Sequence, residues 1–401
     1  MEAMCTMFWI ISFSLFVHVN GDRRVCDFNV DVVKDCDAVI TKPLNLKSAQ
    51  LKNVNIDLLC ERGVFCINIL NVATVNMLNT NIKCSKGTFG IKVENSMLSM
   101  GSSSISSCDV GVNATSFSTL SFLNSTFSGI DSDNFNLAAV VGKNGQAIWI
   151  SDCTFKDNGR AVMSVFVDKT VISNTDFYNN RKSGPVSLGG SALHINGGNV
   201  SLDQVRCEYN SFFFGEGGTI FIKNAVEINI LRSKFNHNSI RHAGSISGGG
   251  LYALFSGPLT VLDTEFSNNT AAADYGGAYG GGMAVYGTHT KLVNVTFNGN
   301  TAKTIVDGGF SSGGGLFHKN GNISITDSLF TENTATHYGG MMYCTDSPGK
   351  IFNTSGQDNT VEDVVCDKAE LLMDKYSICN IPTVRSHNGD CVVQMEIKRV
   401  P

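Results

Sequence analysis

The sequence contains few charged residues, and neither sign predominates strongly. Only 16% of its 401 residues are Asp, Glu, Lys or Arg, and the formal net charge is −5. Nucleic-acid-binding domains carry an excess of basic residues, so this composition argues against a nucleic-acid partner. Apart from one run near the N-terminus there is no long apolar segment, so we expect no membrane-spanning helix in the mature chain.

The cysteines lack the spacing of a zinc site, because no two of them form a C-x-x-C pair. We therefore predict no bound metal, and nothing in the sequence indicates a cofactor. Without Cys5, twelve cysteines remain, an even number that favours disulfides in an exported protein, although their connectivity cannot be read from the sequence. They are Cys26, Cys36, Cys60, Cys66, Cys84, Cys108, Cys153, Cys207, Cys344, Cys366, Cys379 and Cys391.

No amphipathic helical pattern runs through the middle of the chain, which excludes a helical repeat. Instead, two motifs recur with a period of about 30 residues, which is typical of stacked supersecondary units. An F-x-x-N motif follows each Gly-Gly pair by 16 to 18 residues, whereas the distance from the Asn to the next Gly-Gly pair varies from 6 to 14. The clearest F-x-x-N copies begin at Phe235, Phe266, Phe297 and Phe330.

The segments between these motifs alternate apolar and polar residues, as in Leu259 to Phe266, which is the period of a β-strand. Two or three strands per unit, separated by Gly and Asn turns, predict one coil of a parallel β-helix. Parallel crossover connections are right-handed, so the solenoid should be right-handed as well. The variable spacing in one place of each repeat predicts loops along one edge.

Each repeated residue type has an expected structural role. The phenylalanines should point inward and form a buried stack: Phe155, Phe177, Phe235, Phe266, Phe297 and Phe330. The Asn three places later tolerates a left-handed turn, and its amide should meet its counterpart in the next coil as an Asn ladder. The paired glycines permit backbone angles or close contacts that a Cβ would prevent.

The chain should therefore be an all-β, right-handed parallel β-helix of about eleven coils with disulfide-bearing caps at both ends. We expect a signal peptide at residues 1–21, an N-terminal cap at 22–45, the β-helix at 46–345 and a Cys-rich C-terminal cap at 346–401. Apolar residues at helical spacing predict a capping helix over residues 361–376. Cys60, Cys84 and Cys108 lie 24 residues apart and are assigned to the Phe position of earlier coils. Cys84 either bridges to one of the other two or all three are small buried hydrophobes, and we prefer the second interpretation.

Export is indicated at the N-terminus and by glycosylation motifs. Met7–Val19 is a run of 13 mostly apolar residues followed by the small-residue end Asn20-Gly21, which resembles a secretory signal peptide without its usual basic start. Seven N-x-S/T sequons predict N-glycosylation. They lie at Asn113, Asn124, Asn199, Asn268, Asn294, Asn322 and Asn353.

The F-x-x-N and Gly-Gly motifs together resemble the repeats of bacterial polymorphic outer-membrane proteins, which are surface-exposed adhesins. More broadly, the chain resembles the right-handed parallel β-helix superfamily that includes pectate lyases. The strong similarity covers roughly residues 150–345, and a degenerate one extends back to about residue 45. The resemblance implies a solenoid in an extracellular setting but no particular ligand.

The loops along the variable edge are the candidate ligand-binding surface, because aromatic, His and Asp side chains suit contact with a sugar or a protein. The candidate residues are Arg241, His242, Asp274, Tyr275, Tyr279, Asp307, Phe310, His337 and Tyr338. The alternative for these residues is a solvated loop edge without a ligand. We predict a secreted or cell-surface protein that binds an extracellular glycan or surface protein, or has a matrix role, without catalysis.

The alternative function is a lyase or hydrolase acting on an acidic polysaccharide. Hydrolases of this fold need a close pair of carboxylates, and the chain has no Asp-Asp sequence. The segment Trp149 to Phe155 weakly resembles a lyase motif, but Asp152 falls one place out of register, so we do not favour a catalytic role for it.

Overall fold

In the computed structural model the regular secondary structure is almost entirely β-strand. The structure describes residues 24–134, 136–183, 189–215, 217–306, 309–374, 376–377, 381, 383–386 and 392–396. Within these residues, fifty strands follow one another from β1 to β50. The predicted signal peptide, Asp307, Cys379 and Cys391 lie outside the described residues.

One turn from the middle of the molecule shows the repeating path. It starts with β35 (Met283–Tyr286), turns into β36 (Thr290–Val293) and bends again into β37 (Thr296–Asn298). The chain then passes through β38 (Thr301–Thr304) and β39 (Ser311–Ser312), which belong to the loop edge, before the next turn begins. The first four of these strands pair in parallel with their counterparts in the next turn, and Ser312 of β39 forms a single parallel bridge to Tyr338.

The strands form a large sheet of 27 strands, a second sheet of 14 strands, and two loop sheets of six and three strands. The large sheet contains β1 (Arg24–Val25), β2 (Val32–Ile40), β4 (Ala49–Leu58), β6 (Thr74–Leu78), β7 (Asn81–Cys84), β9 (Met97–Gly101), β10 (Ser104–Ser106), β12 (Thr119–Leu123), β13 (Thr126–Ser128), β15 (Ala147–Ser151), β16 (Thr154–Lys156), β18 (Lys169–Ser173), β19 (Asp176–Tyr178), β22 (Asn199–Asp203), β23 (Arg206–Glu208), β26 (Glu227–Leu231), β27 (Lys234–Asn236), β31 (Leu259–Leu262), β32 (Glu265–Ser267), β36, β37, β41 (Ile323–Thr326), β42 (Leu329–Thr331), β45 (Gly349–Phe352), β46 (Ser355–Gln357), β48 (Glu370–Asp374) and β50 (Val392–Glu396). The second sheet contains β3 (Leu44–Leu46), β5 (Phe65–Leu70), β8 (Phe89–Glu94), β11 (Val110–Thr115), β14 (Val140–Lys143), β17 (Val162–Val165), β21 (Leu193–Asn196), β25 (Ile220–Lys223), β30 (Leu251–Leu254), β35, β40 (Leu316–Lys319), β44 (Met342–Thr345), β47 (Val364–Asp367) and β49 (Val384–Ser386). The loop sheets contain β20 (Arg181–Ser183), β24 (Ser211–Phe213), β28 (Ser239–His242), β33 (Thr270–Ala273), β38 and β43 (Thr334–Ala335), and then β29 (Ile246–Ser247), β34 (Ala278–Tyr279) and β39.

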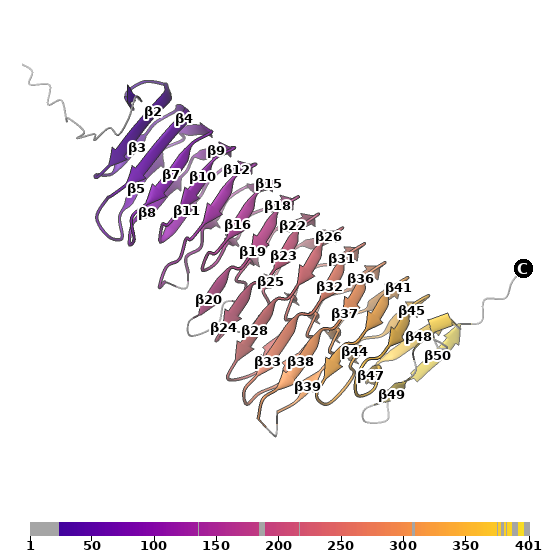
Figure 1. The fold of residues 1–401 in the computed structure, drawn as a ribbon. Helices are drawn as coiled ribbons and strands as arrows, with labels where there is room; N and C mark the ends of the chain where they lie inside the picture. The colour runs from indigo at the N-terminus through magenta and orange to yellow at the C-terminus, as the bar shows by residue number, and fades with distance from the viewer. Residues whose placement is uncertain are drawn as a thin grey trace, which may run out of the picture.

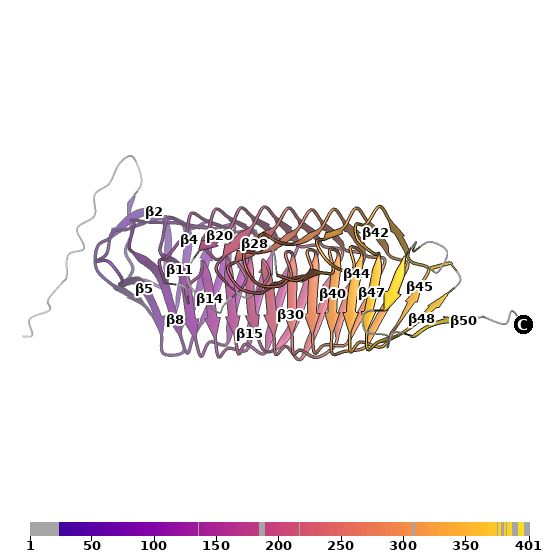
Figure 2. The same cartoon turned by 90° about the horizontal axis from the view of Figure 1, so that it is seen from below.

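The molecule is a rod with the first described strands, β1 and β2, at one end and the last, β48 and β50, at the other (Figure 1), and the loops of the middle coils lie over the second sheet (Figure 2). The predicted right-handed parallel β-helix is confirmed. The second sheet has fourteen strands rather than the eleven coils expected. The difference arises because stacking continues at both ends into the segments that we expected to form caps.

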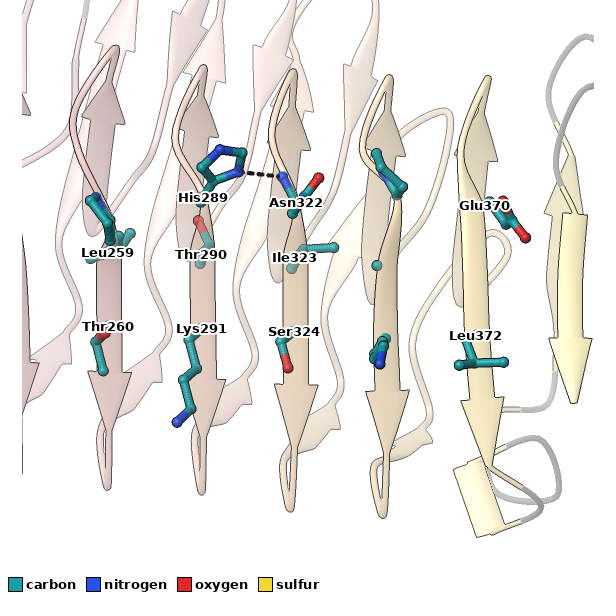
Figure 3. A pocket seen from close by; sticks show the side chains of 14 residues that line it. Leu259, Thr260, His289, Thr290, Lys291, Asn322, Ile323, Ser324, Glu370 and Leu372 are labelled. Carbon is teal, nitrogen blue, oxygen red and sulfur yellow. Dashed lines mark hydrogen bonds between the residues drawn. The ribbon is translucent and has the colours of Figure 1, made fainter. Parts of the chain in front are cut away.

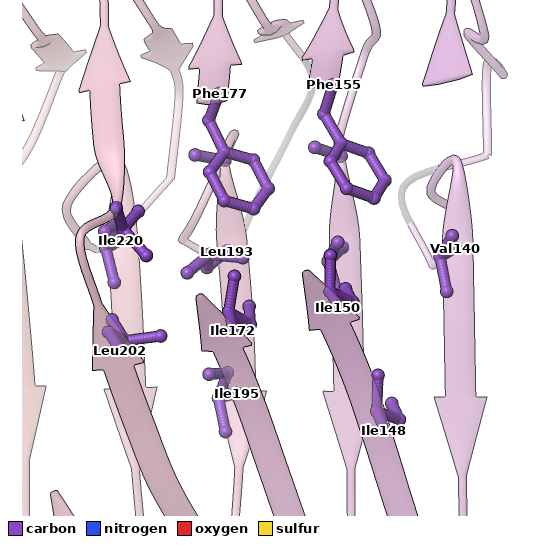
Figure 4. Close-up of a cluster of buried hydrophobic side chains, with 14 of the residues drawn as sticks. Val140, Ile148, Ile150, Phe155, Ile172, Phe177, Leu193, Ile195, Leu202 and Ile220 are labelled. Atoms are coloured by element: carbon purple, nitrogen blue, oxygen red, sulfur yellow. The ribbon is translucent and has the colours of Figure 1, made fainter. Parts of the chain in front are cut away.

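Phenylalanine rings fill the interior at one position of seven coils, and Figure 4 shows two of them, Phe155 and Phe177. Neighbouring rings are stacked with centroids 4.6 to 5.1 Å apart, in one run from Phe127 to Phe177 and a second from Phe235 to Phe330. Cys207 takes the equivalent place between the two runs and is fully buried. The spacing matches the distance between paired strands of about 4.8 Å, so the predicted Phe stack is confirmed.

The expected register of the early cysteines was wrong. Ile82 and Ile105, rather than Cys84 and Cys108, pair with each other and then with Phe127 at the Phe position. Cys84 and Cys108 instead form a disulfide between successive coils, which also overturns our preference for free buried thiols. The residue count of a degenerate repeat does not reveal where a short bend inserts or removes residues, so spacing alone misplaced them.

Two further disulfides lie near the N-terminal end, between Cys26 and Cys36 and between Cys60 and Cys66. The cysteines Cys153, Cys207 and Cys344 are free and buried, whereas Cys366 is disulfide-bonded. Three disulfides thus lie in the early coils, where isoleucines take the place of the stacked phenylalanine rings, and Cys366 forms another near the C-terminal end.

The ladder asparagines form a buried hydrogen-bonded column along the rod. From Asn158 to Asn333, each Nδ2 donates to the Oδ1 of the next ladder Asn at 2.8 to 3.0 Å. Each also donates to the backbone carbonyl at the Phe position of the preceding coil. The ladder members are Asn158, Asn180, Asn210, Asn238, Asn269, Asn300, Asn333 and Asn359. The predicted Asn ladder is confirmed.

The left-handed backbone conformation expected at the ladder Asn lies one residue earlier. His237, Asn268 and Gly299 have φ values of 51°, 54° and 63°, and each directly precedes a ladder Asn. The left-handed bend is made by the residue before the buried Asn, and the side chain of that Asn reaches both neighbouring coils.

The glycine pairs mark places where successive coils approach each other closely. A Cβ on Gly281 would lie 2.5 Å from the backbone nitrogen of Thr301 and 2.5 Å from the carbonyl oxygen of Gly314. The residue before the pair, Gly280, has a φ of 66°. A side chain at Gly281 would therefore push two coils apart, which confirms the close contact predicted for the pair.

The predicted helix over residues 361–376 is wrong. This segment contains β47 and β48, which pair with β44 of the second sheet and β45 of the large sheet. Leu371 and Met373 point inward with period two. The open edge of the preceding coil offers unpaired backbone groups, and pairing with that edge outweighs a weak helical pattern.

The ladder predicts a large difference between two asparagine substitutions. Asn269 is fully buried and makes four hydrogen bonds, with Phe235, Asn300 and, through its Oδ1, with the backbone and side-chain nitrogens of Asn238. Asn269→Ala leaves these buried partners without their hydrogen bonds, so the free energy of unfolding should fall by about 3 kcal/mol. Asn229→Ala, at a partly exposed site on β26, should change it by less than about 0.5 kcal/mol. Denaturant unfolding measures both, and equal effects would contradict a stabilising ladder.

Candidate functional site

The loops of successive coils stack on one another instead of projecting separately. Strands β28, β33, β38 and β43 pair in parallel, as do β29, β34 and β39. Buried apolar side chains fill the space beneath them and include Ile240, Ile246, Ala271, Ala273 and Ala302. The loop edge is therefore a stacked extension of the rod with a core of its own.

Four candidate residues lie at the earlier end of this edge. The Arg241 guanidinium donates from Nε to Oδ1 of Asp274 at 2.9 Å. His242 accepts a hydrogen bond from the backbone of Gly244 through Nδ1. Tyr275 is 73% exposed. The ion pair joins two coils, and because Arg241 is half-exposed it contributes little to stability.

The later candidates Phe310, His337 and Tyr338 form, together with Tyr343, a group of aromatic rings that we call the aromatic patch. The ring centroids of Phe310 and Tyr338 are 6.2 Å apart, and those of Tyr338 and Tyr343 are 6.4 Å apart. His337 lies 5.8 Å from Phe310 and accepts a hydrogen bond from the backbone of Ser311. Phe310 is 56% exposed, and the other three side chains are half-buried.

Beneath the loops, a row of aromatic side chains on the outer face of the second sheet joins the patch to the middle of the rod. Phe221, Tyr252, Phe317 and Tyr343 occupy equivalent places on their strands. Ala284 interrupts this column, and there Tyr286 lies 5.6 Å from Tyr252 and 5.1 Å from Phe317.

The loop residue Tyr279 covers this row, with its ring centroid 4.9 Å from that of Phe317. It therefore anchors the loop to the second sheet instead of facing solvent freely. Burial raises the pKa of Tyr279 and raises the pKa of Tyr343 to about 12, so both phenols stay protonated near neutral pH. Neutral phenols can donate hydrogen bonds while their rings pack against apolar surfaces.

Sequence reasoning missed the residues of this row, including Tyr343 in the patch. The apolar run after each Gly-Gly pair was interpreted only as part of the core. Its residues in fact alternate between the interior of the rod and the outer face of the second sheet. Leu316 and His318 point into the rod, and Phe317 between them points outward but is only 4% exposed. Aromatic residues recur at the outward position of successive strands, and this pattern in the sequence could have indicated that loops cover the outer face of the second sheet.

The large sheet carries a groove of about 660 Å³ on its outer surface near the C-terminal end (Figure 3). Five successive coils line it, and its walls include His289, Lys291, Asn322, Pro348 and Leu372. His289 accepts a hydrogen bond through Nδ1 from the backbone nitrogen of Asn322 at 3.0 Å. The groove lies on a different sheet from the aromatic patch.

A second, more polar hollow lies further toward the N-terminus and includes Asp152, Asp176 and Arg206. Asp176 and Arg206 form a bidentate ion pair, with oxygen–nitrogen distances of 2.5 and 2.6 Å. Hydrogen bonds from Ser151 and Asn174 lower the pKa of Asp152. A carboxyl group held ionised in this way is unsuited to act as a general acid.

Six of the seven sequon asparagines are exposed, and all six belong to coils of the large sheet or to their bends: Asn124, Asn199, Asn268, Asn294, Asn322 and Asn353. Asn113 is half-buried on the second sheet, and its Oδ1 has no hydrogen-bond partner among the described residues. The exposed motifs and the aromatic patch thus lie on different parts of the rod's surface.

Within the ranges that the structure describes, no cluster of three or more His, Cys, Asp or Glu side chains has the geometry to hold a metal ion. No helix in those ranges is long and apolar enough to cross a bilayer. The arrangement at the loop edge offers ring faces, phenol hydroxyls and an ion pair, which are groups suited to contact with a ligand.

Comparison with known proteins gives structural similarities only. No protein-family model matches the sequence, and no curated protein matches it. The periplasmic alginate epimerase AlgG is 11% identical, with 91% of this chain and 85% of that chain covered and a TM-score of 0.36. The tailspike protein of E. coli bacteriophage HK620 is 11% identical, with 90% of this chain and 74% of that chain covered and a TM-score of 0.34.

PfbA, a surface adhesin of Streptococcus pneumoniae, is 8% identical, with 92% of this chain and 85% of that chain covered and a TM-score of 0.33. These three proteins include an enzyme and an adhesin. At such identities and TM-scores the similarity assigns neither a reaction nor a ligand to this chain.

Two buried histidines predict that stability decreases in mild acid. Burial, reinforced by the charge of Arg160, lowers the pKa of His194 to about 3, and burial lowers the pKa of His318 to about 4. The unfolded chain binds protons below about pH 6.5 that the folded chain does not, so each histidine should remove about 2 kcal/mol of stability between pH 7 and pH 5.

The test compares the free energy of unfolding at these two pH values in the wild type and in His318→Gln. The variant keeps hydrogen-bonding groups for Ser347 and Thr290 and should lose about 2 kcal/mol less than the wild type. His237→Gln, at an exposed site, is the control and should leave the pH dependence unchanged. If the pH dependence of His318→Gln equals that of the wild type, His318 takes up its proton between pH 7 and pH 5 in the folded state as it does in the unfolded chain, which would contradict the prediction.

Proposed function

We propose that this chain is an exported, non-catalytic binding protein whose loop edge recognises an extracellular glycan. The aromatic patch at the end of the loop sheets is the observation that carries the proposal. Its rings come from three different segments of the chain and lie together on the rod's surface. Sugar rings have C–H-rich faces that pack against aromatic rings, while hydroxyls at the rim take hydrogen bonds.

The patch also has polar groups at its border. Arg385 donates to Glu362 at 2.6 Å, and the strand containing Arg385 pairs with β47, which in turn pairs with the strand containing Tyr343. Together with the phenols of Tyr338 and Tyr343, this ion pair supplies donors and acceptors beside the ring faces. The combination supports recognition of a polar, ring-shaped ligand more than of a purely apolar one.

Export is part of the same proposal. Three disulfides between Cys26 and Cys108 suit an oxidising compartment, and the short apolar run before residue 22 resembles a signal peptide. The repeats also resemble those of surface-exposed adhesins. The proposed setting is therefore the cell surface or the surrounding matrix, with N-glycans on the exposed sequons.

The test is a glycan array followed by calorimetry with the best ligand. Tyr338→Ala and Phe310→Ala should each weaken binding at least about tenfold, because truncating a central aromatic residue of an interface costs roughly 1–2 kcal/mol or more. Tyr178→Ala is the matched control, since Tyr178 is 47% exposed in the large sheet and contacts another ring, that of Tyr209. It should bind as the wild type does.

Turnover is measured in parallel on the glycans that bind, with and without calcium. Binding without new reducing ends or unsaturated products supports the proposal. Product formation would instead make the chain a polysaccharide-degrading enzyme, and unchanged affinity in both patch variants would remove the loop edge as the binding surface.

A further inference from the structure

We infer that the groove on the large sheet is the seat of the chain's own N-linked glycan at Asn322, whose first N-acetylglucosamine residues pack against its walls. Both functional residues of this sequon, Asn322 and Ser324, line the groove. The point of attachment is thus inside the hollow that the sugar would occupy. The inference rests on the export that is part of the proposed function.

The position of Asn322 on its coil puts it in the middle of the groove. Thr290, Ile323 and Gly349 pair in register across three coils, so the residues before them, His289, Asn322 and Pro348, follow one another along the rod. Figure 3 shows His289 and Asn322 side by side at the upper ends of their strands, with Lys291 and Ser324 below them. A sugar on Asn322 therefore has walls on both sides along the rod.

These walls have the chemistry that an N-acetylglucosamine residue requires. The imidazole of His289, the ring of Pro348 and the side chain of Leu372 offer flat or apolar surfaces to a sugar face. Lys291 and Lys350 are exposed and can donate hydrogen bonds to hydroxyl or acetamido oxygens. The hydrogen bond from the backbone of Asn322 holds the His289 ring in place.

The attachment itself is an ordinary group transfer during export. The amide Nδ2 of Asn322 forms a bond to the anomeric carbon of the sugar, the bond from that carbon to a lipid pyrophosphate breaks, and the amide gives up one proton. The co-substrate is a lipid-pyrophosphate-linked oligosaccharide of the secretory pathway. The groove then forms around the sugar as the coils stack.

Asn199 is a matched control within the same chain. By the register of the strands it occupies on its own coil the place that Asn322 occupies later, and it is also exposed and part of a sequon. Its neighbours in this column are Lys169 and Glu227, which are long charged side chains instead of a proline and an imidazole. A glycan at Asn199 should therefore extend into solvent.

The experiment uses the full chain produced in glycosylating secretory cells and treated, while folded, with an amide-cleaving glycosidase. Peptide mass mapping follows the conversion of each glycosylated Asn to Asp. Release at Asn322 should be at least about tenfold slower than at Asn199, because the enzyme must first displace the sugar from its seat. After denaturation the two rates should be equal. Leu372→Ala, which removes one wall, should speed release at Asn322 and leave Asn199 unchanged.

Absence of a glycan at Asn322, equal release from the two sites in the folded protein, or no effect of Leu372→Ala would each overturn the inference. Loss of glycan-array binding with the Asn322 glycan still protected would refute the proposed function while leaving the inference intact. Binding on the array combined with rapid release of the glycan at Asn322 would support the proposed function and refute the inference about the groove.

Discussion

The hydrogen bond from each ladder asparagine to the next coil sets the spacing and register of this molecule. Because Nδ2 also reaches the carbonyl at the Phe position of the preceding coil, one side chain ties three coils together, as Asn269 does with Phe235 and Asn300. With that register in place, identical residues come to lie over one another at the strand-pairing distance. The stacked rings of Phe266 and Phe297 are a consequence of this register.

The same register determines what the surface can do. A residue type repeated at one outward position becomes a continuous column, so a single chain can carry surfaces of different chemistry on its different sheets. The loop edge and the outer face of the second sheet collect aromatic rings, ending in the patch around Tyr338. The large sheet collects the exposed sequons and the groove around Asn322. A glycan coat on the large sheet would therefore leave the aromatic patch uncovered.

Most of the architecture was predictable because its signals are local and repeated. The F-x-x-N and Gly-Gly motifs identify the inward Phe, the ladder Asn and the close contact at Gly281 without knowledge of distant residues. Prediction failed where the repeat degenerates. Ile82 and Ile105 take the Phe position in place of Cys84 and Cys108, since a β-branched apolar side chain fills the same interior space. Residues 361–376 were predicted to be helical because the sequence does not show the strands β44 and β45 with which this segment pairs.

By itself, the sequence determined the coil, its inward-facing residues and the edge along which loops accumulate, because these depend on alternation and spacing within one repeat. The tertiary structure decided which outward residues meet, since contacts such as Tyr279 with Phe317 join segments whose separation depends on how the loop folds back. It also decided the Cys84–Cys108 disulfide and the placement of Asn322 in a groove. Each of these depends on the alignment of one coil against the next, which loop lengths alone do not encode.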